Sequence, residues 1–365
     1  MLKNCARDLT RNFKTTFIRA GLATLAAFAL LPVAFAQLSG TNQVLDNPGD
    51  PNFNQLLGIN NGRVIVGYFG DGSIVPNNGY VLVPKNHYSV ENFTHLPSGD
   101  HASETQAIGI NDGQLVSIVG FYTDNATNFT HGFADIDAVQ LTVDDPAGSP
   151  PHVTTPAQNL LGINDSQYAA GFWTDNNGHE HGFVVKINVS SPSKNKYVEI
   201  PPSTFAGAVA TQASNITDHN EVCGFWTDGS GNNHGFYGTL GGTLYTFNVE
   251  IGGVTATSTT PFGCNNNGEI VGTFTNGSGQ HGFVFAFGAY DQFDYPGSSQ
   301  TVAFGVAGTT INGINDNGTV VGFYVDANGN TIGTVGTPAP EPGSILLLAS
   351  GLLGVGLLRR RQKPV

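Results

Sequence analysis

Short apolar runs, separated by Gly, Asn and Asp, recur along the chain between residues 40 and 335. No segment there shows the 3.6-residue spacing of a long helix. Several runs contain adjacent aromatic residues, such as Phe172-Trp173 and Phe225-Trp226. Because neighbouring residues of a strand point to opposite faces, adjacent aromatics indicate sheets that are covered on both faces. The pattern predicts an all-β protein of short, stacked strands.

The apolar runs belong to a repeated unit that begins Gly-Ile-Asn-Asp. Three copies are complete, at Gly109, Gly162 and Gly313, and three are weaker. The central residues of the six copies are separated by 51, 53, 53, 48 and 50 positions. Each copy continues with a Gly, aromatic residues and an Asp/Asn/Gly turn, and four copies then have His-Gly-Phe. Four short strands per repeat of about 50 residues is the period of a propeller blade, and it is too long for one coil of a β-helix.

The two edges of the repeat array complement each other. The sixth copy ends at Ile332-Gly333-Thr334 without a fourth strand, whereas Val44 to Gly49, before the first copy, matches the fourth-strand pattern. A strand exchanged in this way latches a closed ring and removes its exposed edges, but it gives a linear solenoid no advantage. We therefore predict a six-bladed β-propeller-like domain over residues 37–336, closed by an N-terminal strand.

The repeated unit resembles the extracellular HAF repeat, here with Gly in the middle of the His-x-Phe triplet. The resemblance extends over nearly all of residues 40–335 and rests on six copies in register. It implies an exported bacterial repeat protein, and it implies no particular activity or ligand.

Residues 1–36 have the pattern of a cleavable secretion signal. Five basic residues precede or begin an apolar run from Ala20 to Val33. Ala34-Phe35-Ala36 then fits the small-x-small site of signal peptidase, with Gln37 as the new N-terminus. A retained membrane anchor is the alternative, but the run is shorter than the roughly 20 residues that a span needs.

Residues 337–365 combine three elements in a fixed order. Pro340-Glu341-Pro342 precedes an apolar stretch from Ile345 to Leu358, and Arg359-Arg360-Arg361 follows it. An apolar helix before a basic cluster is a stop-transfer signal, although this one is short for a permanent transmembrane helix. The order resembles the PEP-CTERM sorting signal of Gram-negative bacteria, which implies recognition by an exosortase-type membrane protease. A plain C-terminal membrane anchor is the alternative, and both place the repeats outside the cytoplasm.

The charge of the repeat region excludes one class of partner. Between Gln37 and Pro338 the chain has five basic and 25 acidic side chains, a formal charge of −20. Such a surface repels phosphate backbones, so we expect no nucleic-acid binding. Neutral sugars, cationic polymers and divalent cations are compatible with it.

The repeat region contains two cysteines, Cys223 and Cys264. Each replaces a small apolar residue of a repeat, and two cysteines form no disulfide framework. We expect two buried free thiols. A bridge, which needs Cα atoms within about 7 Å, is the alternative.

Four strand-end histidines are the candidate ligands: His131, His181, His234 and His281. They occur once per blade, whereas metal ligands converge on one point. We expect them to hydrogen-bond turn aspartates, as in WD-repeat propellers. The expected partners are Asp112, Asp165 or Asp218 of the Gly-Ile-Asn-Asp turns, and Asp316 in the sixth copy is expected to be structural as well. His179-Glu180-His181 is a tight cluster without a third ligand, so no metal site is predicted.

The sequence carries no recognisable catalytic motif. It lacks a Gly-x-Ser-x-Gly elbow, a phosphate loop and a His-Glu-x-x-His pair. Asp144-Asp145 is a paired carboxylate that we expect in an exposed turn. The Asp/Asn/Gly turns lack the full Ca²⁺-loop spacing, so we predict no cofactor, with weak Ca²⁺ binding left open.

We therefore predict a non-catalytic cell-surface or extracellular-matrix protein that binds a polysaccharide or a protein partner. The alternative is a propeller-type carbohydrate-active enzyme, a glycosidase or lyase, with carboxylates assembled across blades. Acidic or histidine side chains converging on the central funnel would indicate the enzyme. A funnel lined by Asn, Thr and Gly would indicate binding or a structural role.

Overall fold

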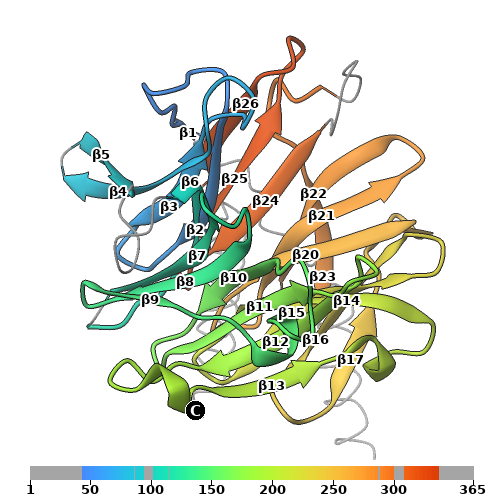
Figure 1. The fold of residues 1–365 in the computed structure, drawn as a ribbon. Coiled ribbons are helices and arrows are strands. Elements are labelled where there is room, and N and C mark those ends of the chain that lie inside the picture. Colours follow the sequence, from blue (N-terminus) through green and yellow to red (C-terminus); the bar gives the residue numbers. More distant parts are fainter. Residues whose placement is uncertain are drawn as a thin grey trace, which may run out of the picture. The chain divides into compact units, whose positions relative to one another are not determined.

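The computed structural model describes residues 43–336, apart from 86, 94–101, 115, 287 and 300–307. These residues form six four-stranded antiparallel sheets, the blades of a β-propeller (Figure 1). The predicted signal peptide and sorting segment, with its expected transmembrane helix over 345–358, lie outside the described residues. Within the described part of the chain, no helix is long and apolar enough to cross a membrane.

Each of the first five blades takes its strands in chain order from the central channel outward. The strands of blades 1 to 3 are β2 (Asn54–Ile59), β3 (Ile65–Phe69), β4 (Asn78–Lys85) and β5 (His87–Phe93); β6 (Ala102–Ile110), β7 (Ser117–Asp124), β8 (Thr130–Ile136) and β9 (Val139–Thr142); β10 (Gln158–Ile163), β11 (Tyr168–Thr174), β12 (Glu180–Lys186) and β13 (Lys196–Ile200). Those of blades 4 and 5 are β14 (Ala208–Ile216), β15 (Glu221–Asp228), β16 (Asn233–Thr239) and β17 (Leu244–Phe247); β20 (Ser258–Cys264), β21 (Ile270–Asn276), β22 (Gly279–Ala286) and β23 (Ala289–Phe293). A short hairpin, β18 (Glu250–Ile251) and β19 (Val254–Thr255), connects blades 4 and 5.

Blade 6 confirms the predicted closure of the ring. It consists of β24 (Thr309–Ile314), β25 (Val320–Val325), β26 (Thr331–Gly336) and, as the outer strand, β1 (Gln43–Val44). β1 runs antiparallel to β26, and the next backbone N–H, of Leu45, donates to the Gly333 carbonyl at 3.0 Å. Figure 1 shows blue β1 beside orange β26. The first strand of the described residues therefore completes the last blade.

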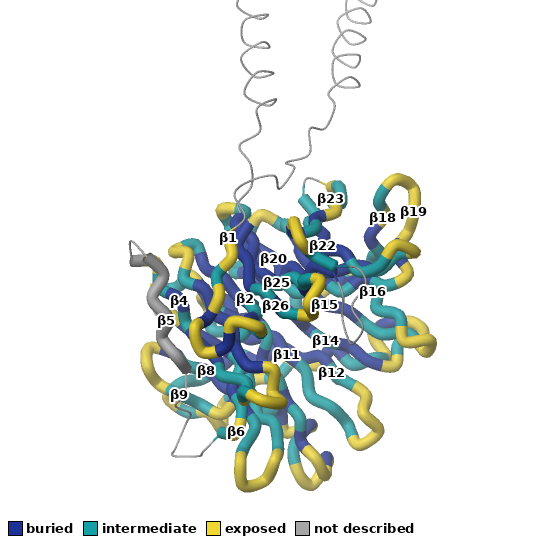
Figure 2. Tube along the Cα trace, turned by 90° about the horizontal axis from the view of Figure 1, so that it is seen from above, coloured by how far each residue is buried: buried dark blue, intermediate teal, exposed yellow. Residues whose placement is uncertain are grey.

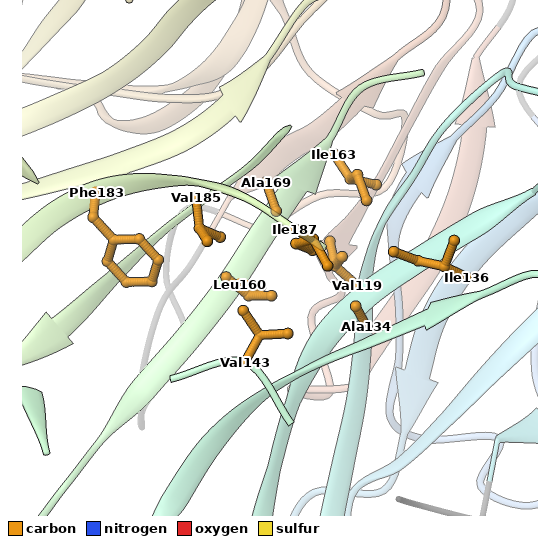
Figure 3. Close-up of a cluster of buried hydrophobic side chains, with 10 residues drawn as sticks. All are labelled: Val119, Ala134, Ile136, Val143, Leu160, Ile163, Ala169, Phe183, Val185 and Ile187. Atoms are coloured by element: carbon orange, nitrogen blue, oxygen red, sulfur yellow. The ribbon is translucent and has the colours of Figure 1, made fainter. Parts of the chain in front are cut away.

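The hydrophobic core lies between blades. Six clusters of buried apolar side chains occur in the described residues, and each draws on two adjacent blades. Figure 3 shows the cluster in which Val119 and Ala134 of blade 2 meet Leu160 and Val185 of blade 3. Figure 2 shows the buried strands inside and the exposed hairpins at the rim. Each blade therefore depends on its neighbours for burial of its apolar faces.

The repeat glycines permit two close approaches. A Cβ on Gly171, in the second strand of blade 3, would lie 2.1 Å from the Asn159 carbonyl oxygen of the inner strand. A Cβ on Gly182, from His-Gly-Phe, would lie 3.0 Å from the backbone nitrogen of Ala213 in blade 4. The Gly182 N–H donates to Thr211 Oγ1 at 2.9 Å. One glycine thus serves packing within a blade, and the other serves packing between blades.

The expectation of free thiols is wrong. Cys223 of β15 and Cys264 of β20 form a disulfide, with their Cα atoms 6.3 Å apart. In the ring, the residue before the glycine of the second strand of one blade packs against the last residue of the inner strand of the next blade. Val119 and Ile163 occupy these two positions in the core between blades 2 and 3, and Cys223 and Cys264 occupy them between blades 4 and 5. Two cysteines in different repeats are therefore neighbours in space, although 41 positions separate them.

The central channel as candidate functional site

The six inner strands build the channel from a common six-residue pattern. The second and fourth residues of the pattern point the same way, because side chains alternate along a strand. The second residues are polar and, except for Asn159, line the channel: Gln55, Gln106, Asn159, Gln212, Thr260 and Thr310. The fourth residues form the next layer: Leu57, Ile108, Leu161, Ser214, Phe262 and Asn312. The sixth residues, five Ile and Cys264, form the last layer, next to the Gly-Ile-Asn-Asp turns.

The channel has a volume of about 780 Å³ and a neutral lining. Its polar groups are amides and hydroxyls, from Gln, Asn, Thr and Ser, and its aromatic groups include Phe53, Phe225 and Phe323. Of the described residues that line it, none is Asp, Glu, His, Lys or Arg. Amides and hydroxyls beside phenyl rings can hydrogen-bond and pack against a neutral polyhydroxylated molecule.

Several lining side chains are held by the neighbouring blade. Gln212 donates to Glu180 at 2.6 Å, and burial raises the pKa of this glutamate. Asn233 donates to Thr260 at 3.1 Å. By contrast, the side-chain amides of Gln55 and Gln106 have no hydrogen bond to another described residue, and both side chains are half-buried. These two amides are therefore available to a ligand in the channel.

At the end of the channel formed by the Gly-Ile-Asn-Asp turns, a ring of hydrogen bonds joins the six blades. In each Gly-Ile-Asn-Asp turn, the backbone N–H of the last residue donates to the side-chain oxygen of the equivalent residue in the next blade. The ring passes in order through Asn61, Asp112, Asp165, Asp218, Asn266 and Asp316 and returns to Asn61. Apart from the short Asn61–Asp112 bond, the distances are 2.8 to 2.9 Å. The turn aspartates thus link blades.

Four carboxylates share this ring, and the pKa values of Asp112 and Asp165 are raised. Burial raises the pKa of Asp112 to about 6, and the charges of Asp316, Asp165 and Asp218 add to the effect. Burial also raises the pKa of Asp165, with the Asp218 charge next in importance. The cavity they enclose is small, about 60 Å³. In the described residues, no group of three or more His, Cys, Asp or Glu is arranged to hold a metal ion.

The histidines have a structural setting, but the predicted aspartate partners are wrong. They pair with carboxylates at the far end of the blade: His131 with Asp144, His181 with Asp175, His234 with Asp228 and His281 with Asp294. Each also lies on an aromatic ring of the second strand, at centroid distances from 4.1 Å for Trp173–His181 to 5.4 Å for Phe274–His281. The sequence could not separate these aspartates from those of the Gly-Ile-Asn-Asp turns, because both kinds occur once in several repeats.

The expectation that Asp144-Asp145 is exposed is also wrong. Asp144 is half-buried against His131, at 2.6 Å, and Asp145 is only 2% exposed. Glu199, at the edge of blade 3, keeps solvent on one side. Partial burial and the adjacent Asp145 carboxyl raise the pKa of Glu199 to about 8. Asp145, which follows blade 2, and Glu199 of blade 3 form this carboxylate pair, and neither is part of the channel lining.

Hydrogen bonds within the Asp/Asn/Gly turns account for their composition, and no metal is needed to explain it. Asp175 Oδ1 accepts the backbone N–H groups of Asn177 and His179, and Asp326 Oδ1 accepts those of Asn328 and Asn330. Each carboxylate therefore stabilises its own hairpin turn. Weak Ca²⁺ binding stays a prediction.

Sequence reasoning missed the channel residues. They are the alternating positions of the strand that leads into each Gly-Ile-Asn-Asp turn, so the signal was present in the aligned repeats: Gln, Asn or Thr, then a residue of variable polarity, then Ile or Cys. That alternation becomes informative once the strand is known to be the innermost of its blade.

Residues 338–361 match the PEP-CTERM protein-sorting motif. A comparison with curated proteins finds no match to the chain. Among solved structures, the Aleuria aurantia lectin is similar at 11% identity over 80% of this chain and 99% of the lectin, with a TM-score of 0.48. The Trypanosoma rangeli sialidase is similar at 9% identity over 82% of this chain and 56% of the sialidase, with a TM-score of 0.46. The sorting motif implies an exported protein of the cell envelope that an exosortase sorts.

Proposed function

We propose that the protein is a non-catalytic, exported surface or matrix protein that binds the end of a neutral polysaccharide in its central channel. The observation that carries the proposal is the neutral, amide- and hydroxyl-rich channel inside a domain of formal charge −20. A charged ligand would find no counter-charge among the described lining residues. A neutral sugar chain can satisfy the unpaired amides of Gln55 and Gln106 and pack on the phenyl rings.

The export signals support the setting of this proposal. The PEP-CTERM motif begins at residue 338, two residues after β26 ends at Gly336. We infer that an exosortase-type protease processes this segment after export and that the propeller is then displayed at the cell surface. The likeness of the repeats to the HAF type and a Gram-negative source stay predictions from the sequence.

The alternative, a glycosidase or lyase, would need two carboxylates near the scissile bond of the sugar. The described channel lining contributes amides and hydroxyls at five of its six second positions instead. A protein with this lining can hold a sugar without supplying the acid and base that hydrolysis requires. This supports binding over catalysis.

Isothermal titration of the full chain with a panel of neutral oligosaccharides tests the proposal. We expect binding to at least one of them, weakened about three- to tenfold by Gln55→Ala or Gln106→Ala, since each removes one hydrogen-bonding amide. Gln114→Ala, at an exposed glutamine outside the channel, is the matched control and should leave affinity unchanged. Absence of binding would refute the proposal, and release of shorter sugars during the titration would favour the enzyme.

A further inference from the structure

The lining of the central channel changes from polar to apolar along its axis. At the end where the inner strands begin, the exposed Gly329 of the blade 6 hairpin lines the channel, and the second positions nearby carry amides and hydroxyls. The fourth positions lie roughly 7 Å further along the strands. On four of the six blades they carry apolar side chains, which are Leu57, Ile108, Leu161 and Phe262. Three isoleucines of the sixth positions follow.

The apolar side chains of the fourth positions remain accessible from the channel. All four are half-buried, although they belong to the innermost strands of their blades. Apolar surface in contact with water is unfavourable, so a ligand group that covers it gains free energy from burial. The deeper section of the channel therefore offers apolar contact to a ligand.

The other two blades carry polar side chains at this depth, and their amides already donate to the protein. The Asn312 amide of blade 6 donates to the Leu56 carbonyl at 3.3 Å. The Asn215 amide of blade 4 donates to the Cys264 carbonyl at 3.2 Å, and the adjacent Ser214 is only 2% exposed. A ligand hydroxyl at this depth would meet mainly apolar side chains, and its desolvation would cost free energy.

The inner strands approach one another closely at the fifth position, which is Gly on five of the six blades. A Cβ on Gly58 of blade 1 would lie 2.5 Å from the Ile108 carbonyl oxygen of blade 2. A Cβ on Gly313 of blade 6 would lie 2.8 Å from the Leu57 carbonyl oxygen of blade 1. Six strands at such close spacing enclose a narrow passage. A slender, unbranched chain suits this section better than the wider ring of a sugar.

We propose that the channel selects a neutral sugar whose end carries an unbranched aliphatic group. The sugar lies among the polar second positions, which include Gln55 and Gln106, and the aliphatic group extends past Ile108 and Leu161 toward the isoleucines of the sixth positions. This inference rests on the proposed function, since it places a neutral sugar in the same channel. An acylated polysaccharide end and a neutral glycolipid share this chemistry.

Methyl, butyl and hexyl β-D-glucoside test the selectivity, because they share one sugar and differ only in the length of the aliphatic group. Titration calorimetry of the full chain, at probe concentrations below micelle formation, should show an affinity that rises about fourfold for each buried CH2 group. Butyl glucoside should therefore bind about tenfold or more tightly than methyl glucoside. 1-Hexanol should bind more weakly than hexyl glucoside, since it lacks the sugar.

A matched pair of variants tests the apolar wall. Ile108→Val and Ile108→Thr leave side chains of nearly the same shape, and only threonine adds a hydroxyl. Ile108→Val should keep most of the preference for hexyl over methyl glucoside, and Ile108→Thr should reduce it about three- to tenfold further. Val139→Thr, at an exposed position of the outer strand β9, is the control and should leave the preference unchanged.

Two further measurements distinguish the sources of the aliphatic group. Co-sedimentation with phosphatidylcholine vesicles that contain a neutral glycolipid, but not with vesicles that lack it, assigns the group to a lipid. Tighter binding of butanoylated cellotriose than of cellotriose, without co-sedimentation, assigns it to a polysaccharide. Failure of both would contradict the proposal.

The outcomes separate this inference from the proposed function. If neutral oligosaccharides bind but the three glucosides bind with equal affinity, the selectivity for an aliphatic group is refuted and the proposed function stands. Equal preferences of Ile108→Val and Ile108→Thr lead to the same conclusion. If 1-hexanol binds as tightly as hexyl glucoside, the sugar contributes nothing and the proposed function fails. If no oligosaccharide and no glucoside binds, both proposals fail.

Discussion

At the scale of single residues, the ring of hydrogen bonds between the Gly-Ile-Asn-Asp turns combines two opposing effects. Each side-chain oxygen accepts a backbone N–H from the adjacent blade, so the ring fixes the order and spacing of the blades. Four of its six members are aspartates, and their charges repel one another. Asn61 and Asn266 accept the same kind of bond with no charge. The amide is therefore a natural replacement for the carboxylate.

Asp112→Asn should stabilise the protein above pH 6 and have no effect below about pH 4. The pKa of Asp112 is raised in the folded state, so its ionisation favours unfolding, and stability falls as the pH rises from the unfolded pKa through about 6. The amide keeps the acceptor for the Asn61 N–H. Because Asp112 is partly open to solvent, we expect a rise in melting temperature of only about 1 to 3 °C at pH 8.

Thermal unfolding followed by circular dichroism between pH 4 and pH 8 measures this effect. Glu250→Gln, which removes an exposed carboxyl of β18 outside the ring, is the matched control for the change in charge. A destabilised Asp112→Asn variant at pH 8 would mean that the bond to Asn61 needs a charged acceptor.

Individual partners were the least predictable part of the molecule. The sequence indicated that His131 and its equivalents are structural, and the stacked rings and carboxylates around them agree with such a role. It assigned the wrong aspartates, because a hydrogen bond depends on which end of the blade a turn occupies. The second strand, Ser117–Asp124 in blade 2, separates the two kinds of turn by its full length.

At the scale of strands and blades, five of the six interfaces between blades share one hydrogen bond from a side chain to a backbone carbonyl. The first Asn of each Gly-Ile-Asn-Asp turn donates from its side chain to the equivalent carbonyl of the next blade, as Asn60 does to Asn111. Blade 4 has Thr217 at this position and makes no such bond to Asn265 of blade 5. The Cys223–Cys264 disulfide joins the same two blades. The covalent bond thus occurs at the interface that lacks the Asn contact.

Reduction of this disulfide should lower stability by about 2 to 4 kcal/mol, because it releases a constraint on the unfolded chain. For a domain of this size the melting temperature should fall by roughly 5 °C in the presence of a reductant. The matched control is Cys223→Val with Cys264→Ile, which restores the pair found at Val119 and Ile163. The double variant should be insensitive to reductant. An unchanged melting temperature of the reduced wild type would show that apolar packing alone holds blades 4 and 5 together.

At the scale of the whole molecule, the propeller fold and its closure were predicted from the sequence more fully than any contact between two residues. Six copies in register repeat the same strand pattern, so errors in one copy are corrected by the others. The missing fourth strand of the last copy and the additional strand at Val44 then determined the closure, which β1 confirms. Contacts between blades could not be predicted in the same way, because they join residues about 50 positions apart whose proximity depends on the ring itself.

The closure should depend on the backbone of β1 more than on its side chains. Leu45→Pro removes the N–H that donates to Gly333, whereas Leu45→Ala keeps it and loses only the packing of a partly buried side chain. We expect the proline variant to be less stable than the alanine variant by about 1 to 3 kcal/mol in urea unfolding, because the Gly333 carbonyl loses its partner. Detachment of β1 also exposes the edge of β26, and an open strand edge promotes pairing between chains. Light scattering after size exclusion should therefore detect dimers or larger species of the proline variant alone. Equal stability and a monomeric state for both variants would show that the ring stays closed without this strand.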